Sequence, residues 1–520
     1  MSSPRSVAGV VALLVFASVL PGLAGGARTD PASSEPTAAW TGEGFGPDRG
    51  IASFDGSNET DPAVVQTVTY RQAPNESGTI HATHRYRVRG NVSTIIVYDY
   101  DDATVVNSRG FDRRESGRWA WDGETAAPTL QWETSVNRTS RHFEGLRWVD
   151  VGNWTLANPR TDFVVRDADH EEWVYSWQDT PRIDQRSRVA ADADGFAGPA
   201  VVYLGPFETT VRNATDQRFR LIRPESARLR EHPDRIMTTL ASAAQQLRVG
   251  ARDETVNVFV GPDPLRYGGT TASGIDGVQD VWVSARADAG SPPSTWIHEY
   301  VHTRQSFVLG DEMTWFREAS ASYYAAVCAI RTPVTERTAY RQFLETLRQD
   351  HGANATLSDR SSWSNTYVPY AKGTRVLAAL DARIRTRTNG TRTLQTVFRR
   401  LNEHDGVVTY DVFATVVGNV TGESQRAWLD DHVRDGREVS PPESPFKYVS
   451  PGGQLDADGD GLSANTERRA GTHPFVADTD ADGVSDGTEL RLGTNPSDPF
   501  SRPLVANGTD AGAESDEPVE

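Results

Sequence analysis

The 520-residue sequence contains a single cysteine, Cys328, so no disulfide can form within the chain and a cysteine-rich zinc site is excluded. It has only two lysines, and its 71 acidic residues outnumber its 53 lysines and arginines, which gives a net charge of -18. This charge argues against a nucleic-acid or anionic-membrane partner, because both require basic surfaces. An acidic, lysine-poor composition keeps a protein soluble at high salt, and we interpret it as a halophile signature.

Long apolar runs are also missing, except at the N-terminus. Residues 7–23 are apolar, follow Arg5, and lead into small residues up to Ala27. This layout is typical of a secretory signal peptide cleaved near Ala24 or Ala27, with an uncleaved membrane anchor as the alternative. No other stretch reaches the ~18 apolar residues of a transmembrane helix, so we expect no membrane span in the mature chain.

Glycosylation sequons are frequent. Ten of the 17 asparagines occur as Asn-X-Ser/Thr, where chance placement would give roughly three. This excess favours a secreted or extracellular glycoprotein. Association with the cell envelope stays open.

The length predicts three or four domains at roughly 100–200 residues each. Short β-like runs separated by turn residues predict an antiparallel β-sandwich in the first half, with His81 and His84 interpreted as surface residues of one run. Helical periodicity begins near Asp234, and one of the expected helices covers 294–309. The fold class is therefore multidomain α+β. We expect a signal peptide over 1–27, a flexible leader over 28–62, the β-sandwich over 63–225, a mainly helical domain over 226–440, a proline-containing linker over 441–453, a repeated acidic module over 454–500 and a disordered acidic tail over 501–520.

Residues 298–302 read His-Glu-Tyr-Val-His, an H-E-x-x-H pattern. On a helix, residues four apart lie on one face, so His298 and His302 can bind one zinc ion with Zn–N distances of about 2.0–2.1 Å. Glu299 can then reach a water molecule at that metal. Chance produces the pattern in roughly one chain per hundred of this length, so an amphipathic helix with two surface histidines is the alternative.

A catalytic zinc site needs a third protein ligand. Glu318 lies 16 residues after His302 in a helix-compatible stretch and can complete a His₂Glu set. Asp311 and Glu312 are rival carboxylates on the expected loop after Gly310. Ser322, one turn beyond Glu318, is either a hydrogen-bond partner of a ligand or an ordinary helical serine.

The region from about 234 to 400 resembles the gluzincin metallopeptidases of the aminopeptidase N and glycyl aminopeptidase type. Three motifs match in order: H-E-Y-x-H at 298–302, W-x-x-E-x-x-A-x-Y at 315–323, and Y-x-K-G within 368–373. The resemblance implies a thermolysin-like, mainly helical catalytic domain over 226–440 with zinc as cofactor and a peptide or protein substrate. It also implies that Glu299 is the general base and that Tyr370 stabilises the tetrahedral intermediate.

Some positions depart from this family. The interval between His302 and Glu318 is about three residues shorter, and Ala319 replaces the glycine that usually follows the third ligand. The G-x-M-E-N motif that binds a free amino end is absent, and residues 274–277 occupy that region without its glutamate. The choice between endopeptidase and aminopeptidase therefore stays open.

The acidic module contains two aligned loops, 22 residues apart, that fit calcium. Carboxylates at positions 1, 3, 5 and 12 with glycine at position 6 suit Ca²⁺, and position 9 is acidic only in the second loop, so the first is expected to bind more weakly. The module resembles thrombospondin type 3 repeats, with an acidic spacer as the alternative, and its folding should depend on the metal. The expected calcium ligands are Asp456, Asp458, Asp460 and Glu467 in the first loop, and Asp478, Asp480, Asp482, Asp486 and Glu489 in the second.

Two functions are compatible with these features. One is a secreted zinc metallopeptidase with a calcium-stabilised appendage. The other is an inactive peptidase-like protein of the cell surface, used for binding or adhesion. The intact motifs favour the first, whereas the missing G-x-M-E-N motif is the argument for the second.

Overall fold

The computed structural model describes residues 62–502, except 74–75, 90, 101, 116, 140–144, 160–161, 169–171, 177–179, 251, 273–276, 333–337, 350–351, 353 and 450–455. The chain forms two compact units, Met1–Pro442 and Glu443–Glu520. The predicted signal peptide, the leader up to residue 61 and the tail beyond Arg502 lie outside the described residues. Within the described residues, no helix is both long and apolar enough to cross a bilayer.

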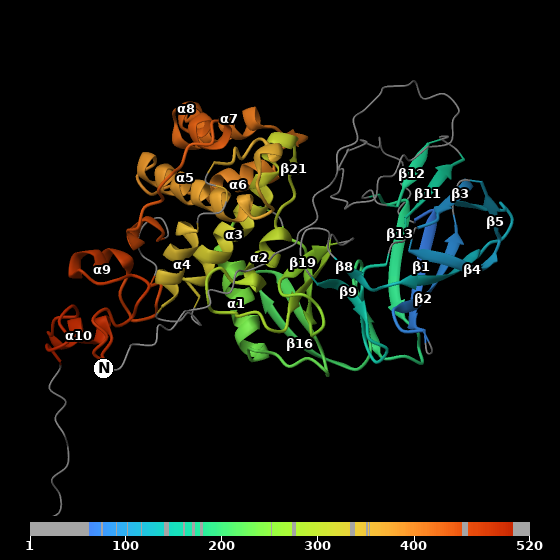
Figure 1. The fold of residues 1–520 in the computed structure, drawn as a ribbon, viewed down its shortest axis with the longest axis horizontal. Helices are drawn as coiled ribbons and strands as arrows, with labels where there is room; N and C mark the ends of the chain where they lie inside the picture. The colour runs from blue at the N-terminus through green and yellow to red at the C-terminus, as the bar shows by residue number, and fades with distance from the viewer. Residues whose placement is uncertain are drawn as a thin grey trace, which may run out of the picture. The chain divides into compact units, whose positions relative to one another are not determined.

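The N-terminal part of the first unit consists of three five-stranded sheets (Figure 1). Alternating burial along strands such as β2 and β7 places Tyr86 and Trp132 in the core. The strand order is β13-β1-β2-β7-β4, then β12-β11-β3-β6-β5, then β14-β15-β10-β9-β8. The strands are β1 Val64–Gln72, β2 Thr79–Val88, β3 Val92–Tyr98, β4 Ala103–Arg109, β5 Phe111–Arg114, β6 Arg118–Trp121, β7 Thr129–Ser135, β8 Arg138–Thr139, β9 Leu146–Asp150, β10 Thr155–Ala157, β11 Phe163–Asp167, β12 Trp173–Tyr175, β13 Ile183–Val189, β14 Gly195–Ala197 and β15 Val202–Leu204.

These sheets are antiparallel as predicted, with one exception. β1 pairs with β13 in parallel, from Val64 opposite Ile183 to Tyr70 opposite Val189. The two strands are more than a hundred residues apart in sequence, so no local pattern could specify this pairing.

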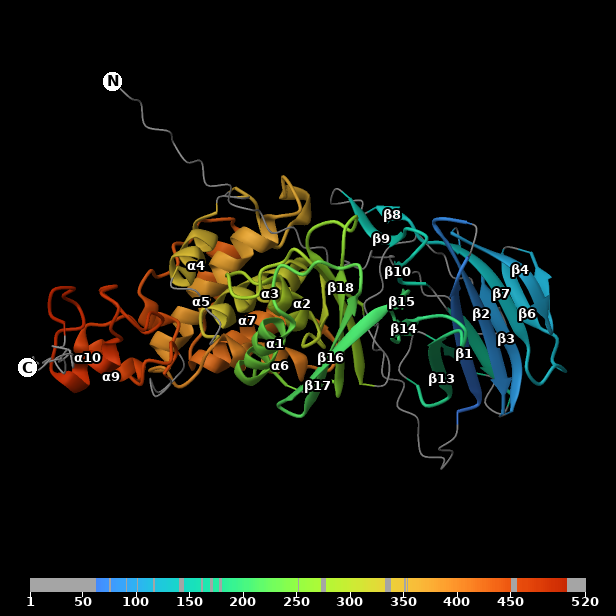
Figure 2. The ribbon, with the colours of Figure 1, turned by 90° about the horizontal axis from the view of Figure 1, so that it is seen from below.

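A fourth sheet connects the N-terminal strands to the helices (Figure 2). Its central strands β17, β18 and β20 are parallel, and β16 and β19 flank them in antiparallel orientation. The β16–β17 hairpin falls within residues expected in the sandwich, yet it hydrogen-bonds to β18. The strands are β16 Phe207–Ala214, β17 Gln217–Pro224, β18 Thr255–Gly261, β19 Gly269–Ala272 and β20 Val278–Ser284.

The two faces of this sheet have different neighbours. Phe259 and Trp282 belong to the core of the N-terminal sheets, whereas Phe219 contacts Tyr300 of a helix on the other face. Asp280 adds a polar link, because one of its carboxylate oxygens accepts hydrogen bonds from the main-chain N–H groups of Ala200 and Val201, both at 2.8 Å. The N-terminal sheets are therefore packed directly on the sheet that carries the helices.

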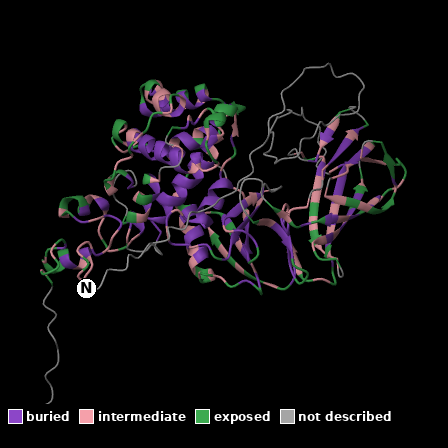
Figure 3. Ribbon diagram, viewed as in Figure 1, coloured by how far each residue is buried: buried purple, intermediate pink, exposed green. Residues whose placement is uncertain are grey.

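Helices make up the rest of the first unit, and buried residues run through α2, α3 and α5 (Figure 3). Gly373 packs on α3, since a Cβ there would lie 2.7 Å from Cβ of Ala319. The helices are α1 Pro233–Gln246, α2 Thr295–His302, α3 Trp315–Ala329, α4 Ala339–Arg348, α5 Thr374–Arg387, α6 Leu394–Asn402, α7 Tyr410–Thr421 and α8 Arg426–Leu429, with short turns η1 Asp311–Met313, η2 Arg360–Ser362, η3 Pro369–Gly373 and η4 Asp430–Arg434 and the strand pair β21 Val308–Leu309 and β22 Val407–Val408.

The second unit contains η5 Pro445–Lys447 and two short helices, α9 Ala464–Ala470 and α10 Asp486–Leu492. Each helix follows one acidic loop. Each ends at a glycine with positive φ, Gly471 at 81° and Gly493 at 79°, a conformation that favours glycine after a helix. The repeat is thus a loop followed by two turns of helix.

His84 corrects one sequence interpretation, because it is buried in β2 against Trp132 rather than lying on the surface. Burial lowers the pKa of His84 to about 3, while an unfolded histidine titrates near 6.5. As the pH falls from 6.5 towards 3, the unfolded chain gains a proton that the folded chain excludes. The folded state therefore loses about 1.4 kcal/mol per pH unit from this residue.

We expect His84→Met to flatten the pH dependence of stability in this window. Between pH 6.5 and 4.5 the wild type should lose about 2 kcal/mol more than the variant, measured by urea unfolding. His81→Met, at a half-exposed histidine of the same strand, is the matched control. Equal slopes for His84→Met and the wild type would contradict this prediction.

Candidate metal centre and active site

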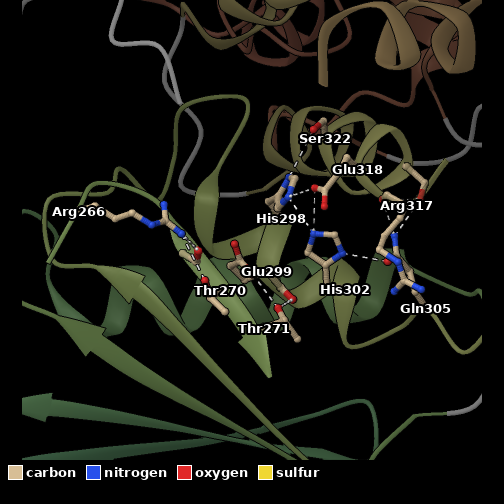
Figure 4. A network of polar contacts seen from close by, with 12 residues as sticks. Arg266, Thr270, Thr271, His298, Glu299, His302, Gln305, Arg317, Glu318 and Ser322 are labelled. Atoms are coloured by element: carbon tan, nitrogen blue, oxygen red, sulfur yellow. Dashed lines mark hydrogen bonds and ion pairs between the residues drawn. The ribbon is translucent and has the colours of Figure 1, made fainter. Parts of the chain in front are cut away.

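Three side chains from two helices converge in the helical part of the first unit (Figure 4). His298 Nε2 lies 3.0 Å from His302 Nε2, and Glu318 Oε2 lies 3.3 Å and 3.4 Å from these two nitrogens. Ligands about 2.0–2.1 Å from a tetrahedral zinc are separated by about 3.3–3.4 Å. All three residues are buried, and the Glu318 carboxylate accepts no hydrogen bond from a described donor. The donor set and its spacing therefore fit a zinc ion.

Hydrogen bonds and burial hold α2 in place, and α3 carries Glu318 near its N-terminus. All eight residues of α2 are buried, and Trp296 Nε1 and Tyr300 OH hydrogen-bond to Ala287 O and Gln217 Oε1, which fix the helix in place. Glu318 lies in the first turn of α3, where the helix dipole favours a carboxylate.

The rival carboxylates do not join this cluster. Asp311 and Glu312 are both exposed in η1, and Glu312 accepts hydrogen bonds from Arg434 at 3.1 Å. Of the three candidate third ligands, the structure brings only Glu318 to the histidines.

Gln305 was not identified from the sequence. Its Oε1 lies 2.9 Å from His302 Nδ1, and its Nε2 donates to Arg317 O and to Ser320 Oγ. Because the amide orientation is set by those two acceptors, Oε1 faces the ring and His302 Nδ1 carries the proton. Nε2 is then the nitrogen directed at the cluster, and in the neutral ring it would offer its lone pair to a metal. Ser322, the predicted candidate partner, is 3.5 Å from His298 Nδ1.

The charges of the cluster reflect burial and mutual contact. Burial lowers the pKa of His298 to about 4, so its ring is neutral at pH 7, the form that binds metal. Burial alone would raise the pKa of Glu318, but His302 and His298 outweigh it and hold the pKa below its usual range.

Glu299 lies beside this cluster on the side of β19. Its side chain is fully buried, and burial raises the pKa of its carboxyl to about 7, near the value suited to a base at neutral pH. The helix thus directs the two histidines to one side and the carboxyl group of Glu299 towards the strand.

Tyr370 is brought to the site by η3, a π-helical turn, which is a type of distortion often found at functional sites. Its ring stacks on His298 with a centroid distance of 5.9 Å and an interplanar angle of 15°. Lys372, two residues on, is buried, and its Nζ donates to Gly436 O at 2.5 Å.

In the second unit, each acidic loop gathers its first three carboxylates. Ligand atoms of Asp456, Asp458 and Asp460 lie within 4.8 Å of one another, and the same holds for Asp478, Asp480 and Asp482. The position-12 residues, Glu467 and Glu489, are fully buried.

Several of these buried oxygens have no donor among the described residues: Asp458 Oδ2, both oxygens of Glu467, Asp480 Oδ2 and Glu489 Oε2. Burial, followed by the charge of neighbouring carboxylates, raises the pKa of Asp458 to about 7 and that of Glu467 to about 8. Buried, crowded oxygens of this kind fit a calcium ion. Asp486 lies outside the two groups of three carboxylates. Its oxygens accept hydrogen bonds from Thr479 N and Thr479 Oγ1 at 2.8 and 2.7 Å.

The two loops also touch each other. Gly487 N, at the start of α10, donates to Asp460 Oδ2 of the first loop at 3.0 Å, and a Cβ at Gly487 would lie 2.1 Å from Asp460 O. The loops therefore form one interlocked structure.

Comparison with known proteins finds a similarity for each part of the chain. The family model of the bacterial TSP3 repeat matches residues 456–477 and 478–499. An aminopeptidase N family protein from Idiomarina loihiensis has a similar structure, with a TM-score of 0.50, 12% identity and coverage of 72% of this chain and 77% of that one. The comparison with curated proteins found no match.

Further solved structures similar to this chain are M1 zinc metallopeptidases from Deinococcus radiodurans. One has a TM-score of 0.46 at 13% identity, covering 73% of this chain and 95% of that one. A variant bound to a Tyr-Ser-Ala substrate has a TM-score of 0.42 at 14% identity, with the same coverage. The structural neighbours of the chain are thus aminopeptidase N family zinc metallopeptidases, and the predicted resemblance is confirmed for the fold and for the C-terminal repeats.

Proposed function

We propose that this chain is an exported zinc metallopeptidase that hydrolyses peptide bonds. The observation that carries the proposal is the convergence of His298, His302 and Glu318, with spacings of 3.0–3.4 Å, beside a buried Glu299. The likeness of the fold to aminopeptidase N family proteins supports it. In this proposal residues 226–440 form a thermolysin-like catalytic domain.

Each residue of the site has one task in this function. His298, His302 and Glu318 would hold zinc, which when bound acidifies water and polarises a carbonyl group. Glu299 accepts the proton of the attacking water and passes it to the leaving amine. The Tyr370 hydroxyl donates a hydrogen bond to the oxyanion of the tetrahedral intermediate. In the C-terminal module, Ca²⁺ would bind the two acidic loops, with Asp486 acting through Thr479 or a bridging water.

The proposed substrate of this chain is a peptide. One of the structural neighbours, from Deinococcus radiodurans, was solved with a Tyr-Ser-Ala substrate bound. Of the residues expected to replace the G-x-M-E-N motif, only Gly277 is described. We therefore propose digestion of a peptide library with mass-spectrometric readout, which reports activity, cleavage position and side-chain preference together.

The decisive control in that experiment is Glu299→Gln. The amide has the same size but cannot accept a proton, so we expect zinc content to be retained and turnover to fall by roughly 10²–10⁴-fold. A wild type that binds zinc but cleaves no peptide, or a fully active Glu299→Gln, would overturn the proposal. The first result would favour the alternative, a peptidase-like binding or adhesion protein of the cell surface.

Tyr370→Phe tests the oxyanion role. The ring and its stacking on His298 are retained and only the hydroxyl is lost, so we expect kcat to fall by about 10²–10³-fold with little change in zinc content. Tyr367→Phe, at a neighbouring tyrosine whose ring lies 6.3 Å from that of Tyr370, is the control. A fully active Tyr370→Phe would assign oxyanion stabilisation to another group.

We also propose that the N-terminal segment directs export and is removed, and that the mature protein is a glycosylated, extracellular protein of a salt-rich environment. The basis is the apolar segment 7–23, the ten sequons and the net charge of -18. N-terminal sequencing of the mature protein tests the cleavage near Ala24 or Ala27.

A further inference from the structure

The general base Glu299 is in contact with one edge strand of the fourth sheet. Thr271 Oγ1, in β19, lies 2.7 Å from Glu299 Oε2 and 3.0 Å from the main-chain oxygen of Glu299 (Figure 4). A hydroxyl group has a single proton to donate. Of the two possible acceptors, the carboxylate oxygen is both nearer and stronger than the main-chain oxygen. The main contact of Thr271 is therefore with the side chain of Glu299.

The strand approaches Glu299 closely because of a glycine. A Cβ at Gly269 would lie 2.6 Å from Glu299 Cγ and 2.7 Å from Glu299 Oε1, so no other residue fits there without displacing the side chain. Arg266 fixes the same strand, since its Nη2 donates to Gly269 O at 2.8 Å. β19 is thus held at a fixed distance from the carboxyl group.

The two oxygens of Glu299 have different surroundings. Oε2 accepts the hydrogen bond from Thr271, whereas Oε1 is buried and accepts no hydrogen bond from a described residue. A carboxylate that is tied down at one oxygen keeps a single side-chain orientation, and its other oxygen remains available to accept a proton.

We propose that Thr271 is a positioning residue for Glu299: its hydroxyl anchors Oε2 and so orients Oε1 towards the water that is deprotonated. The inference rests on the proposed peptidase function. It concerns the orientation of the base and not the binding of metal or of the peptide. Removing the hydroxyl should therefore lower kcat and leave KM and zinc affinity unchanged.

Three variants of β19 separate this role from packing. Thr271→Val removes the hydroxyl and keeps the shape, and we expect kcat to fall by about 10–100-fold, as for other supporting hydrogen bonds in metal sites. Thr271→Ser keeps the hydroxyl and should retain most of the wild-type kcat. Thr270→Val is the matched control, because the Thr270 hydroxyl contacts Arg266 Nη2 at 3.3 Å and neighbouring strand residues face opposite ways.

Each outcome has a defined meaning. Equal losses in Thr271→Val and Thr271→Ser, or wild-type kcat in Thr271→Val, would overturn the inference while leaving the peptidase function intact. An inactive wild type would instead overturn the proposed function. Crystal structures of the zinc-loaded wild type and of Thr271→Val then still test the contact. A wild-type Glu299 side chain turned away from Thr271 would refute the positioning role. The Oγ1–Oε2 hydrogen bond in the wild type, together with a changed Glu299 rotamer in Thr271→Val, would support it.

Discussion

Replacement of Glu318 by alanine is expected to abolish both zinc binding and peptidase activity. A catalytic zinc site needs three protein ligands, and this substitution leaves only His298 and His302. It also removes the carboxylate that would offset the charge of a buried dication, which makes the remaining site unfavourable for metal. Zinc content after dialysis, measured by atomic emission, should fall from one ion per chain to nearly none.

Glu312→Ala is the matched control for this experiment. Glu312 is also a glutamate near the start of α3, but it is exposed and paired with Arg434. It should keep zinc and activity. Zinc retained at wild-type affinity in Glu318→Ala would show that another group supplies the third ligand.

Removal of calcium is expected to unfold residues 456–499 while the zinc site keeps its activity. Each loop holds several carboxylates close together, with buried oxygens that have no donor among the described residues. The buried apolar residues of the module are few: Ala457, Ala464, Pro474, Phe475 and Pro496. The repulsion among these charges exceeds what so small a core can offset, so metal binding and folding should be one event. Extracellular sites of this type bind at ~10⁻⁴–10⁻³ M.

Limited proteolysis with and without a calcium-selective chelator tests this expectation. Chelation should expose the module to cleavage, and peptidase activity should persist because the module forms a separate compact unit. Glu489→Gln should mimic chelation, whereas Asp498→Asn, outside both loops, should not. Equal protection in both conditions would show that the loops do not bind calcium.

The contact between the two loops allows a further prediction about calcium binding. Because Gly487 N hydrogen-bonds to Asp460 Oδ2 and its Cα packs on the Asp460 main chain, Gly487→Ala in the second repeat should weaken calcium binding in the first. The first loop lacks an acidic residue at position 9, and this contact supplies support that its own sequence does not.

Most of the site residues that the sequence could predict belong to short local motifs. H-E-x-x-H depends only on helical spacing, and the first three carboxylates of each calcium loop are close together in the sequence. The structure brings the two histidines together, and it also gathers those three carboxylates in each loop. Glu318 came from the need for a third ligand, with Asp311 and Glu312 as rivals, and the structure places it in the cluster. Tyr370 came from the family resemblance, and its ring lies against His298. Their catalytic roles remain predictions.

Contacts between distant segments could not be predicted in this way. Thr271 reaches Glu299 only because β19 forms the antiparallel edge of a sheet, and the parallel pairing of β1 with β13 has no local signal. α2 was expected to continue to residue 309 but ends at His302, where Thr303 Oγ1 bonds back to Tyr300 O. That early end lets Gln305 turn back towards the His302 ring.

The burial of Lys372 has a practical consequence for solution experiments. Only two lysines exist in the chain, and the amino group of Lys372 is enclosed and bonded to Gly436 O, whereas Lys447 is exposed in the second unit. An amine-reactive dye should therefore label the folded protein at Lys447 and at the terminal amine alone. Because Lys447 adjoins the repeats in the sequence, the fluorophore on Lys447 would follow their calcium-dependent folding without any engineered attachment site.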